Sequence, residues 1–224
     1  MSYRSIGHNR ILQRVVARLR RQRFQILRNL LSELAGPVTI LDIGGVAEYW
    51  QLVTGGVLSD DLHITLLNVD ASPVSHAKFT TLAGDGRAMP QFVDKQFDIV
   101  FSNSTIEHVG SFQNQVRMAK EVRRIGRRYF VQTPNRYFPI EPHFIFPFLQ
   151  FLPVAVRVWL ILRLRLGWYG TRPTPPQVLN DVTSIRLLSR AEMRLLFPDA
   201  TIADEKWCGL VKSFVAYDRA GQRR

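Results

Sequence analysis

The sequence predicts an α/β protein built on a doubly wound, mostly parallel sheet. Two observations support this. Short runs rich in Val, Ile, Leu and Phe alternate with stretches that have helical apolar spacing, and most of these runs end in glycine, acidic or small polar residues. Buried parallel strands have such continuous apolar runs, and strands that alternate with helices form parallel sheets. The expected strands are residues 38–43, 63–70, 79–84, 97–103 and 128–133.

The first element is an expected helix over residues 11–34, where apolar residues recur on one face and arginines on the other. Gly36 and Pro37 end it. We expect four parts in the chain: a basic amphipathic helix within 1–36, the sheet core at 37–137, an apolar helical cover at 138–182, and a C-terminal helix with edge strands at 183–224.

The later elements follow the same reasoning. Residues 111–126 have helical spacing. Ser189 and Glu192 have the spacing of a capping box, which places a short helix at 188–197. Residues 200–217 supply the last strands, expected as an antiparallel pair at one edge of the sheet.

The apolar segment 138–166 is the least regular part of the chain. Between Phe144 and Leu162 only Gln150 and Arg157 are strongly polar, so the run is nearly long enough to span a bilayer. Internal prolines and flanking arginines argue against a simple spanning helix. We expect a helical hairpin packed on the sheet as the cover of a pocket, with contact to a membrane surface and a true span as alternatives, followed by a loop at 168–181.

The charge balance favours an acidic partner. Thirty Lys and Arg against eighteen Asp and Glu give a net charge of +12, which suits nucleic acid, an anionic membrane surface or an anionic substrate, and equally a solvated basic surface. The basic residues form three groups: Arg4, Arg10, Arg14, Arg18, Arg20, Arg21, Arg23 and Arg28; Lys120, Arg123, Arg124, Arg127 and Arg128; and Arg157, Arg163, Arg165 and Arg172.

A single cysteine, Cys208, excludes a disulfide framework and a zinc site built on paired cysteines. The N-terminus has no secretory signal pattern. We therefore expect a cytoplasmic protein, and leave peripheral contact with the inner membrane open.

The carboxyl ends of the expected strands are the predicted binding site, because ligands of open parallel sheets bind there, near the point where the strand order reverses. Glycines after the first strand let the backbone approach a ligand closely. Asp70 lies where a carboxylate can accept the two hydroxyls of a ribose, or where it caps a helix. Asp85 lies one strand further along, where a carboxylate can accept from an exocyclic amine.

These motifs resemble those of the class I S-adenosylmethionine-dependent methyltransferases, in particular the small bacterial "type 11" group. The motifs are residues 40–45, Asp70, 84–90 and 97–108, which together cover roughly residues 38–135. The resemblance implies a Rossmann-like fold, an enzyme, and S-adenosylmethionine as cofactor. It also implies cofactor-binding roles: Asp42, Gly44 and Gly45 beside the methionine part, Asp70 at the ribose, Asp85 and Gly86 at the adenine, and Asn103 on the floor near the methionine part.

The chain departs from the family pattern at one point. The family has a further glycine where this chain has Val46 followed by Ala47. Val46 makes the backbone there stiffer than glycine does.

Candidate catalytic residues follow from the chemistry that the resemblance implies. A sulfonium methyl group is already activated, so the protein mainly aligns the attacking atom and excludes water, and a neutral oxygen nucleophile also needs a base. The candidates for that role are Glu107, His108 and His143. Arg136 and Tyr137 are expected to bind an anionic group of the substrate, unless they pair with Glu141. The histidines show no H-x-x-x-H spacing and no cluster of acids accompanies them, so the sequence predicts no metal site.

We therefore expect a methyltransferase acting on a small-molecule, lipid-linked or saccharide acceptor at oxygen. One alternative is a non-catalytic binding protein with this fold at a membrane surface, suggested by Val46. Another is an RNA methyltransferase, suggested by the net charge. Nucleic acid is the less favoured partner, because Ser102-Asn103-Ser104-Thr105 stands where amino-methyltransferases of nucleic acids usually have an Asn/Asp-Pro-Pro-aromatic stretch. The oligomeric state is not predicted.

Overall fold

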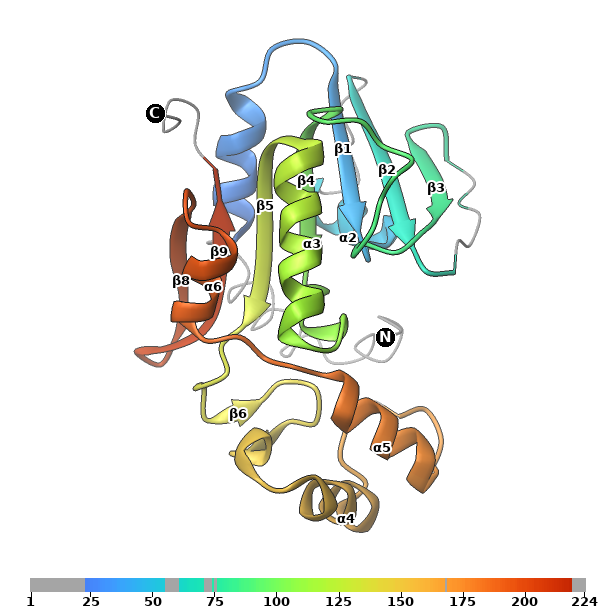
Figure 1. Ribbon diagram of the computed structural model, residues 1–224, viewed down its shortest axis with the longest axis vertical. Helices are drawn as coiled ribbons and strands as arrows, with labels where there is room; N and C mark the ends of the chain where they lie inside the picture. Colours follow the sequence, from blue (N-terminus) through green and yellow to red (C-terminus); the bar gives the residue numbers. More distant parts are fainter. Residues whose placement is uncertain (1–22, 55–60, 71–73, 75, 168, 219–224) are drawn as a thin grey trace.

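The computed structural model describes residues 23–54, 61–70, 74, 76–167 and 169–218. Its centre is a seven-stranded sheet of order β3-β2-β1-β4-β5-β9-β8 (Figure 1). The chain leaves β1 for β2 and β3 and then returns to place β4 on the other side of β1, so the strand order reverses between β1 and β4. The strands are β1 Val38–Ile43, β2 Leu62–Asn68, β3 Phe79–Ala83, β4 Phe97–Asn103, β5 Gly126–Pro134, β8 Thr201–Trp207 and β9 Leu210–Tyr217.

The sheet is parallel from β3 to β5 and antiparallel at the β5–β9–β8 edge. This confirms the predicted fold class, and the described strands match the expected ones to within two residues at each end. The antiparallel pair is the last hairpin of the chain, joined by a turn at Cys208 and Gly209, both with positive φ.

Helices cover both faces of the sheet. On one face α3 (Phe112–Ile125) and α6 (Arg190–Leu196) bury Met118, Val122 and Met193 against the strands. On the other face lie α2 (Ala47–Thr54) and a helix over residues 23–32, which buries Leu27 and Leu30. The predicted N-terminal helix is thus part of the sheet's core from residue 23 onward, and its expected beginning at residues 11–22 lies outside the described residues.

A separate cover lies beyond the carboxyl ends of the parallel strands, at the bottom of Figure 1. It has a small apolar core of its own, made by Phe144, Leu149, Ile161, Val178 and Val182. Its elements are β6 Ile140–Glu141, β7 Phe146–Pro147, the 3-10 turn η3 Leu149–Phe151, α4 Val154–Leu164 and α5 Pro175–Ser184.

The cover corrects two predictions. The helical pair consists of α4 and α5, and it packs at the end of the sheet instead of on its face. Part of the expected loop 168–181 belongs to α5, because Pro175 and Pro176 occupy the first helical turn, where a missing N–H costs nothing. Among the described helices, none has the length and hydropathy of a membrane-spanning segment.

Candidate active site

A tight glycine turn follows β1 at the point where the strand order reverses. Gly44 has a φ of 77°, and a Cβ there would lie 2.4 Å from the Thr105 Oγ1. At Gly45 a Cβ would lie 1.7 Å from the Asp42 Oδ2. Neither position therefore accepts a side chain without rearrangement, and the turn brings bare backbone against the Asp42 carboxylate and the segment that follows β4.

Asp42 is a buried acid with one acceptor left over. Its side chain is 1% exposed, and Trp50 Nε1 donates to Oδ2 at 2.7 Å. Oδ1 has no hydrogen-bond partner among the described residues. Burial raises the pKa of Asp42 to about 7, against the lowering effect of the Trp50 hydrogen bond. An incoming donor, such as the α-ammonium group of an amino acid, would satisfy Oδ1.

The other predicted cofactor residues lie along the same edge of the sheet. Gly86 is close to β1, since a Cβ there would lie 2.7 Å from the Ile43 Cγ2. Asn103 ends β4, and its amide oxygen accepts from Arg23 Nη1. Asp70 is exposed two residues after β2. Asp85 follows β3 and forms a two-pronged ion pair with Arg87, whose hydrogen bond lowers the pKa of Asp85.

This arrangement fits S-adenosylmethionine at three separate points. Asp42 Oδ1, which has no partner among the described residues, suits the α-ammonium group of the methionine part. Gly44 and Gly45 leave the backbone of the turn bare, with the Thr105 and Asp42 side chains packed against it. The Asp70 carboxylate is open to solvent, where it can accept from ribose hydroxyls.

The three predicted catalytic residues come together although His143 is 35 positions from His108. Glu107 and His108 lie in the 3-10 turn η2 (Ile106–His108) after β4, and His143 lies between β6 and β7. His143 Nε2 and His108 Nε2 are 3.2 Å apart. One nitrogen of each histidine and one Glu107 carboxylate oxygen all lie within 4.8 Å of one another.

Two further groups hold this cluster in place. Glu141 Oε1 is 2.6 Å from His143 Nδ1, and its Oε2 accepts from the backbone N–H groups of His143 and Phe144. Thr133 Oγ1 donates to Glu107 Oε2 at 3.0 Å. Glu107 Oε1 is buried and has no partner among the described residues. We call Glu107, His108, Glu141 and His143 the Glu–His cluster.

Burial and neighbouring charges shift the pKa values of Glu107, His143 and His108. Burial raises the pKa of Glu107, although the charge of His143 and the Thr133 hydrogen bond act against it. Burial also disfavours the charged form of His143, but the hydrogen bond and charge of Glu141 outweigh it and raise the pKa of His143. Desolvation and the charge of His143 lower the pKa of His108, whose side chain is nevertheless partly open to solvent. His108 is thus the accessible member of the cluster.

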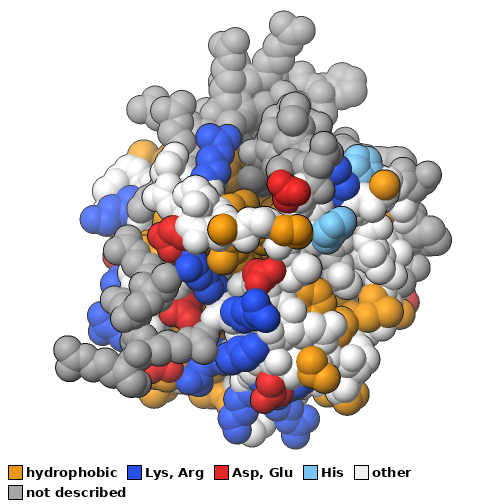
Figure 2. Space-filling model, turned by 90° about the horizontal axis from the view of Figure 1, so that it is seen from above, with side chains coloured by type: hydrophobic (Ala, Val, Ile, Leu, Met, Phe, Trp, Pro, Cys, Tyr) orange, Lys and Arg blue, Asp and Glu red, His pale blue; other side chains and the backbone are white. Residues whose placement is uncertain are grey.

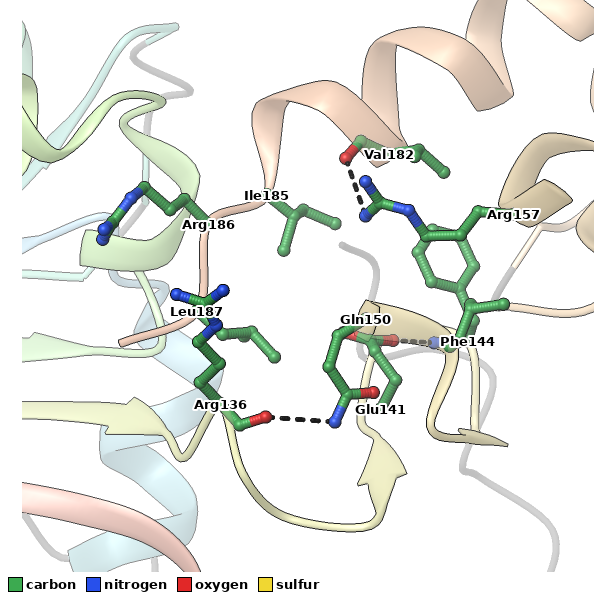
Figure 3. A pocket seen from close by; sticks show the side chains of 10 residues that line it. Arg136, Glu141, Phe144, Gln150, Arg157, Val182, Ile185, Arg186 and Leu187 are labelled. Atoms are coloured by element: carbon green, nitrogen blue, oxygen red, sulfur yellow. Dashed lines mark hydrogen bonds between the residues drawn. The ribbon is translucent and has the colours of Figure 1, made fainter. Parts of the chain in front are cut away.

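A cavity of about 200 Å³ adjoins the cluster, between the sheet and the cover (Figure 3). Glu141 lines it, and the backbone N–H of Arg186 donates to the Glu107 carbonyl, which joins the cavity wall to η2. Arg157 reaches in from α4 opposite Arg136, while the Arg186 guanidinium turns away. The lining residues are Arg136, Glu141, Phe144, Leu149, Gln150, Arg157, Val182, Ile185, Arg186 and Leu187.

The predicted substrate residues have different outcomes. Arg136 lines the cavity. Tyr137 is 64% exposed and stacks on Phe151. The Glu141 carboxylate, which was the alternative partner for both, is instead held by His143 and by backbone N–H groups.

Three residues of the site, Arg23, Glu141 and Arg157, are not predicted as site residues from the sequence. Arg23 belongs to the first basic group, yet it is 5% exposed and ion-paired with the buried Glu205. Glu141 is expected only as a partner for Arg136 or Tyr137, and Arg157 only as a polar residue in an apolar run and a member of the third basic group. A charged residue inside an apolar segment is the one signal that the sequence offers, because charges are rarely buried without a partner.

The second basic group faces away from this site. Figure 2 looks onto the opposite end of the molecule, where the parallel strands begin, and shows Lys and Arg side chains with acids between them. The arginines of the second basic group form ion pairs: Arg123 with Asp199, Arg124 with Asp94 and Glu121, Arg127 with Asp98, and Arg128 with Glu33. These arginines are therefore largely neutralised by their neighbours. In the first group, residues other than Arg23 and Arg28 lie outside the described residues.

Comparisons with known proteins agree with this architecture. Residues 43–128 match a family model described as a methyltransferase domain. Over 54 residues the chain is 41% identical to the uncharacterized protein Rv1509 of Mycobacterium tuberculosis, which is 24% of this chain and 18% of that protein. The chain thus spans less than a fifth of the length of that relative.

Solved structures show the same fold at low sequence identity. The magnesium protoporphyrin IX methyltransferase of Synechocystis, with bound S-adenosylhomocysteine, is 12% identical with a TM-score of 0.51, over 95% of this chain and 90% of that one. A Rhodobacter sphaeroides chain, provisionally described as a zinc-dependent alcohol dehydrogenase, is 11% identical with a TM-score of 0.54, over 86% and 87%. At such identities the likeness concerns the fold alone.

Proposed function

Because residues 43–128 match a family model described as a methyltransferase domain, we propose that the protein transfers a methyl group from S-adenosylmethionine to an oxygen atom of a small-molecule, lipid-linked or saccharide acceptor. One observation carries the proposal. The glycine turn after β1 and the Glu–His cluster lie at the same edge of the sheet, joined by the close approach of Gly44 to Thr105.

The cofactor half of the site is the edge of the sheet. There Asp42, Gly44 and Gly45 bind the methionine part, Asp70 the ribose, Asp85 and Gly86 the adenine side, and Asn103 the floor. When bound, the cofactor supplies a methyl group already activated by the sulfonium charge. The protein's share of catalysis is to align the acceptor oxygen with that group and to exclude water.

The acceptor half is the Glu–His cluster and the adjoining cavity. In this proposal His108 is the base that faces the acceptor; His143 Nε2 contacts its Nε2, and Glu141 holds His143 through Nδ1. The acceptor hydroxyl gives its proton to His108, its oxygen bonds to the methyl carbon, and the carbon–sulfur bond breaks to release S-adenosylhomocysteine. Apolar lining residues with Arg136 and Arg157 suit an acceptor that has an apolar body and an anionic group.

A lipid-linked acceptor has separate support from the surface of the cover. Phe148, Trp159 and Leu164 are each more than half exposed there. Large apolar side chains beside arginines are typical of surfaces that contact an anionic membrane. By contrast, the paired arginines at the opposite end do not support an RNA-binding face.

Calorimetric titration with S-adenosylhomocysteine tests the proposal first. We expect micromolar binding by the wild-type protein, strongly weakened in Asp70→Ala and unchanged in Asp199→Ala, a control at the far edge of the molecule. Transfer of tritiated methyl groups to sugars, small aromatic alcohols and prenyl-linked saccharides then identifies the acceptor class. Folded protein that binds neither the cofactor nor its product would favour the non-catalytic alternative suggested by Val46.

A further inference from the structure

The Glu–His cluster has the ligands of a metal site. Two histidine nitrogens and a carboxylate oxygen form the set that holds catalytic zinc in some enzymes and ferrous iron in others. The three side chains come from two places far apart in the chain, after β4 and after β6, so local spacing gives no sign of the set.

The histidine geometry suits a shared ion. Two imidazole nitrogens at about 2.0 Å from one tetrahedral ion lie roughly 3.3 Å apart. The two Nε2 atoms are 3.2 Å apart. The ring centroids are 4.9 Å apart. The two ring planes are nearly perpendicular, at 89°.

The surroundings of each ligand point the same way. Histidines that bind metals usually donate their other ring N–H to a carboxylate, and His143 Nδ1 contacts Glu141 Oε1 at 2.6 Å. Glu141 is itself fixed by two backbone N–H groups. Thr133 donates a hydrogen bond to Glu107 Oε2, whereas Glu107 Oε1 is buried with no partner among the described residues. An ion bound to Glu107 Oε1 would give this buried oxygen the partner that it lacks.

We propose that Glu107, His108 and His143 bind one divalent first-row transition-metal ion, such as Zn²⁺, and that Glu141 positions His143 for it. The partly open side of His108 leaves a coordination position for another ligand. With an ion bound, His108 would be a ligand and not the base. The acceptor hydroxyl would take the open position, and the ion would lower its pKa so that its proton passes to water. Only this role of the ion depends on the proposed methyl transfer; the binding of the ion does not.

The test is calorimetric titration of chelator-treated, full-length protein with ZnCl₂. We expect one ion per chain for the wild type, and about 10- to 100-fold weaker binding in Glu141→Gln, where only the support of His143 changes. His108→Ala and Glu107→Gln should bind more weakly still. His63→Ala removes an exposed histidine at the start of β2 and should bind like the wild type. Mg²⁺ in excess should not compete, because it prefers oxygen ligands.

Two results would overturn the proposal: no saturable binding of Zn²⁺ by folded wild-type protein, or equal binding by His108→Ala and the wild type. The His108 side chain is open to solvent, so its variant should fold, and circular dichroism of every variant checks this. S-adenosylhomocysteine titration of the same samples separates the two proposals. Binding of this product without binding of Zn²⁺ removes the metal site alone, whereas Zn²⁺ binding without the product removes the methyl transfer alone.

Discussion

The sheet edge and the cover meet at one site but are built in different ways. At the sheet edge, Asp42, Gly44 and Gly45 are fixed by contacts so close that a methyl group does not fit. In the cover, a small apolar cluster stands beside a cavity with arginines, and large apolar side chains such as Trp159 face solvent. In the proposed function the edge binds one unchanging ligand, the cofactor, and the cover recognises the acceptor. Substitutions at the edge should therefore change the unfolding free energy much more than substitutions in the cover.

The largest effect should come from the buried acid at the edge. Asp42 has an ordinary pKa of 3.8, which burial raises to about 7 in the folded protein. A raised carboxyl pKa stabilises the fold at low pH, and this stabilisation is lost as the pH rises from about 4 to 7. With ~1.4 kcal/mol per pKa unit, the loss amounts to about 4 kcal/mol.

Asp42→Asn keeps an acceptor for Trp50 but does not titrate. The unfolding free energies of the two proteins are measured in urea between pH 4 and pH 8.5. The value for the variant, relative to that for the wild type, should rise up to about pH 7 and stay constant above it. Curves that stay parallel over the whole range would contradict the burial of an ionisable group at this position.

The next largest effect should come from replacing a glycine of the turn after β1 by alanine. In Gly45→Ala the new Cβ would displace the Asp42 carboxylate, so we expect a loss of about 1–3 kcal/mol in unfolding free energy and of S-adenosylhomocysteine binding. Gly170→Ala is the matched control in the cover, because no heavy atom lies within 4 Å of the place that its Cβ would take. Thermal unfolding and calorimetry should separate the two variants clearly.

The same difference explains how much of the molecule can be predicted from the sequence. The strands and the glycine turn are local patterns, so five strands, the fold and the Asp42–Gly45 segment follow from short stretches. The cover joins residues far apart in the chain: Arg136, Arg157 and Val182 line one cavity, and no local pattern contains all three. Glu107, His108 and His143 are predicted singly from their positions after strands, but their grouping, and the support of His143 by Glu141, require the fold.

A smaller effect, of opposite sign, is expected inside the cavity. Arg157 Nε is buried without a partner among the described residues, and burial lowers the pKa of the guanidinium. Arg157→Met removes this unsatisfied group at the loss of only the long hydrogen bond from Nη1 to the Val182 carbonyl (3.4 Å), and should raise the unfolding free energy by about 0.5–1 kcal/mol. Arg163→Met, on the exposed side of the same helix, should leave it unchanged. Once an acceptor is known, its KM should rise in Arg157→Met, and a lowered stability would argue that Arg157 is a structural residue.

The smallest effect on stability should come from the outer surface of the cover. Trp159 is 62% exposed on α4, so Trp159→Ala should change the unfolding free energy by less than about 0.5 kcal/mol. Its effect should instead appear in sedimentation with vesicles of phosphatidylglycerol, because a large apolar side chain beside arginines adds to binding at an anionic membrane.

Leu195→Ala is the control for this surface, since Leu195 is 72% exposed on α6, away from the cover. Weaker vesicle binding in the Trp159 variant alone would assign membrane contact to the cover, and would make a lipid-linked acceptor the first to test. Equal sedimentation of both variants and the wild type would contradict membrane contact by Trp159, and soluble acceptors would then be tested first.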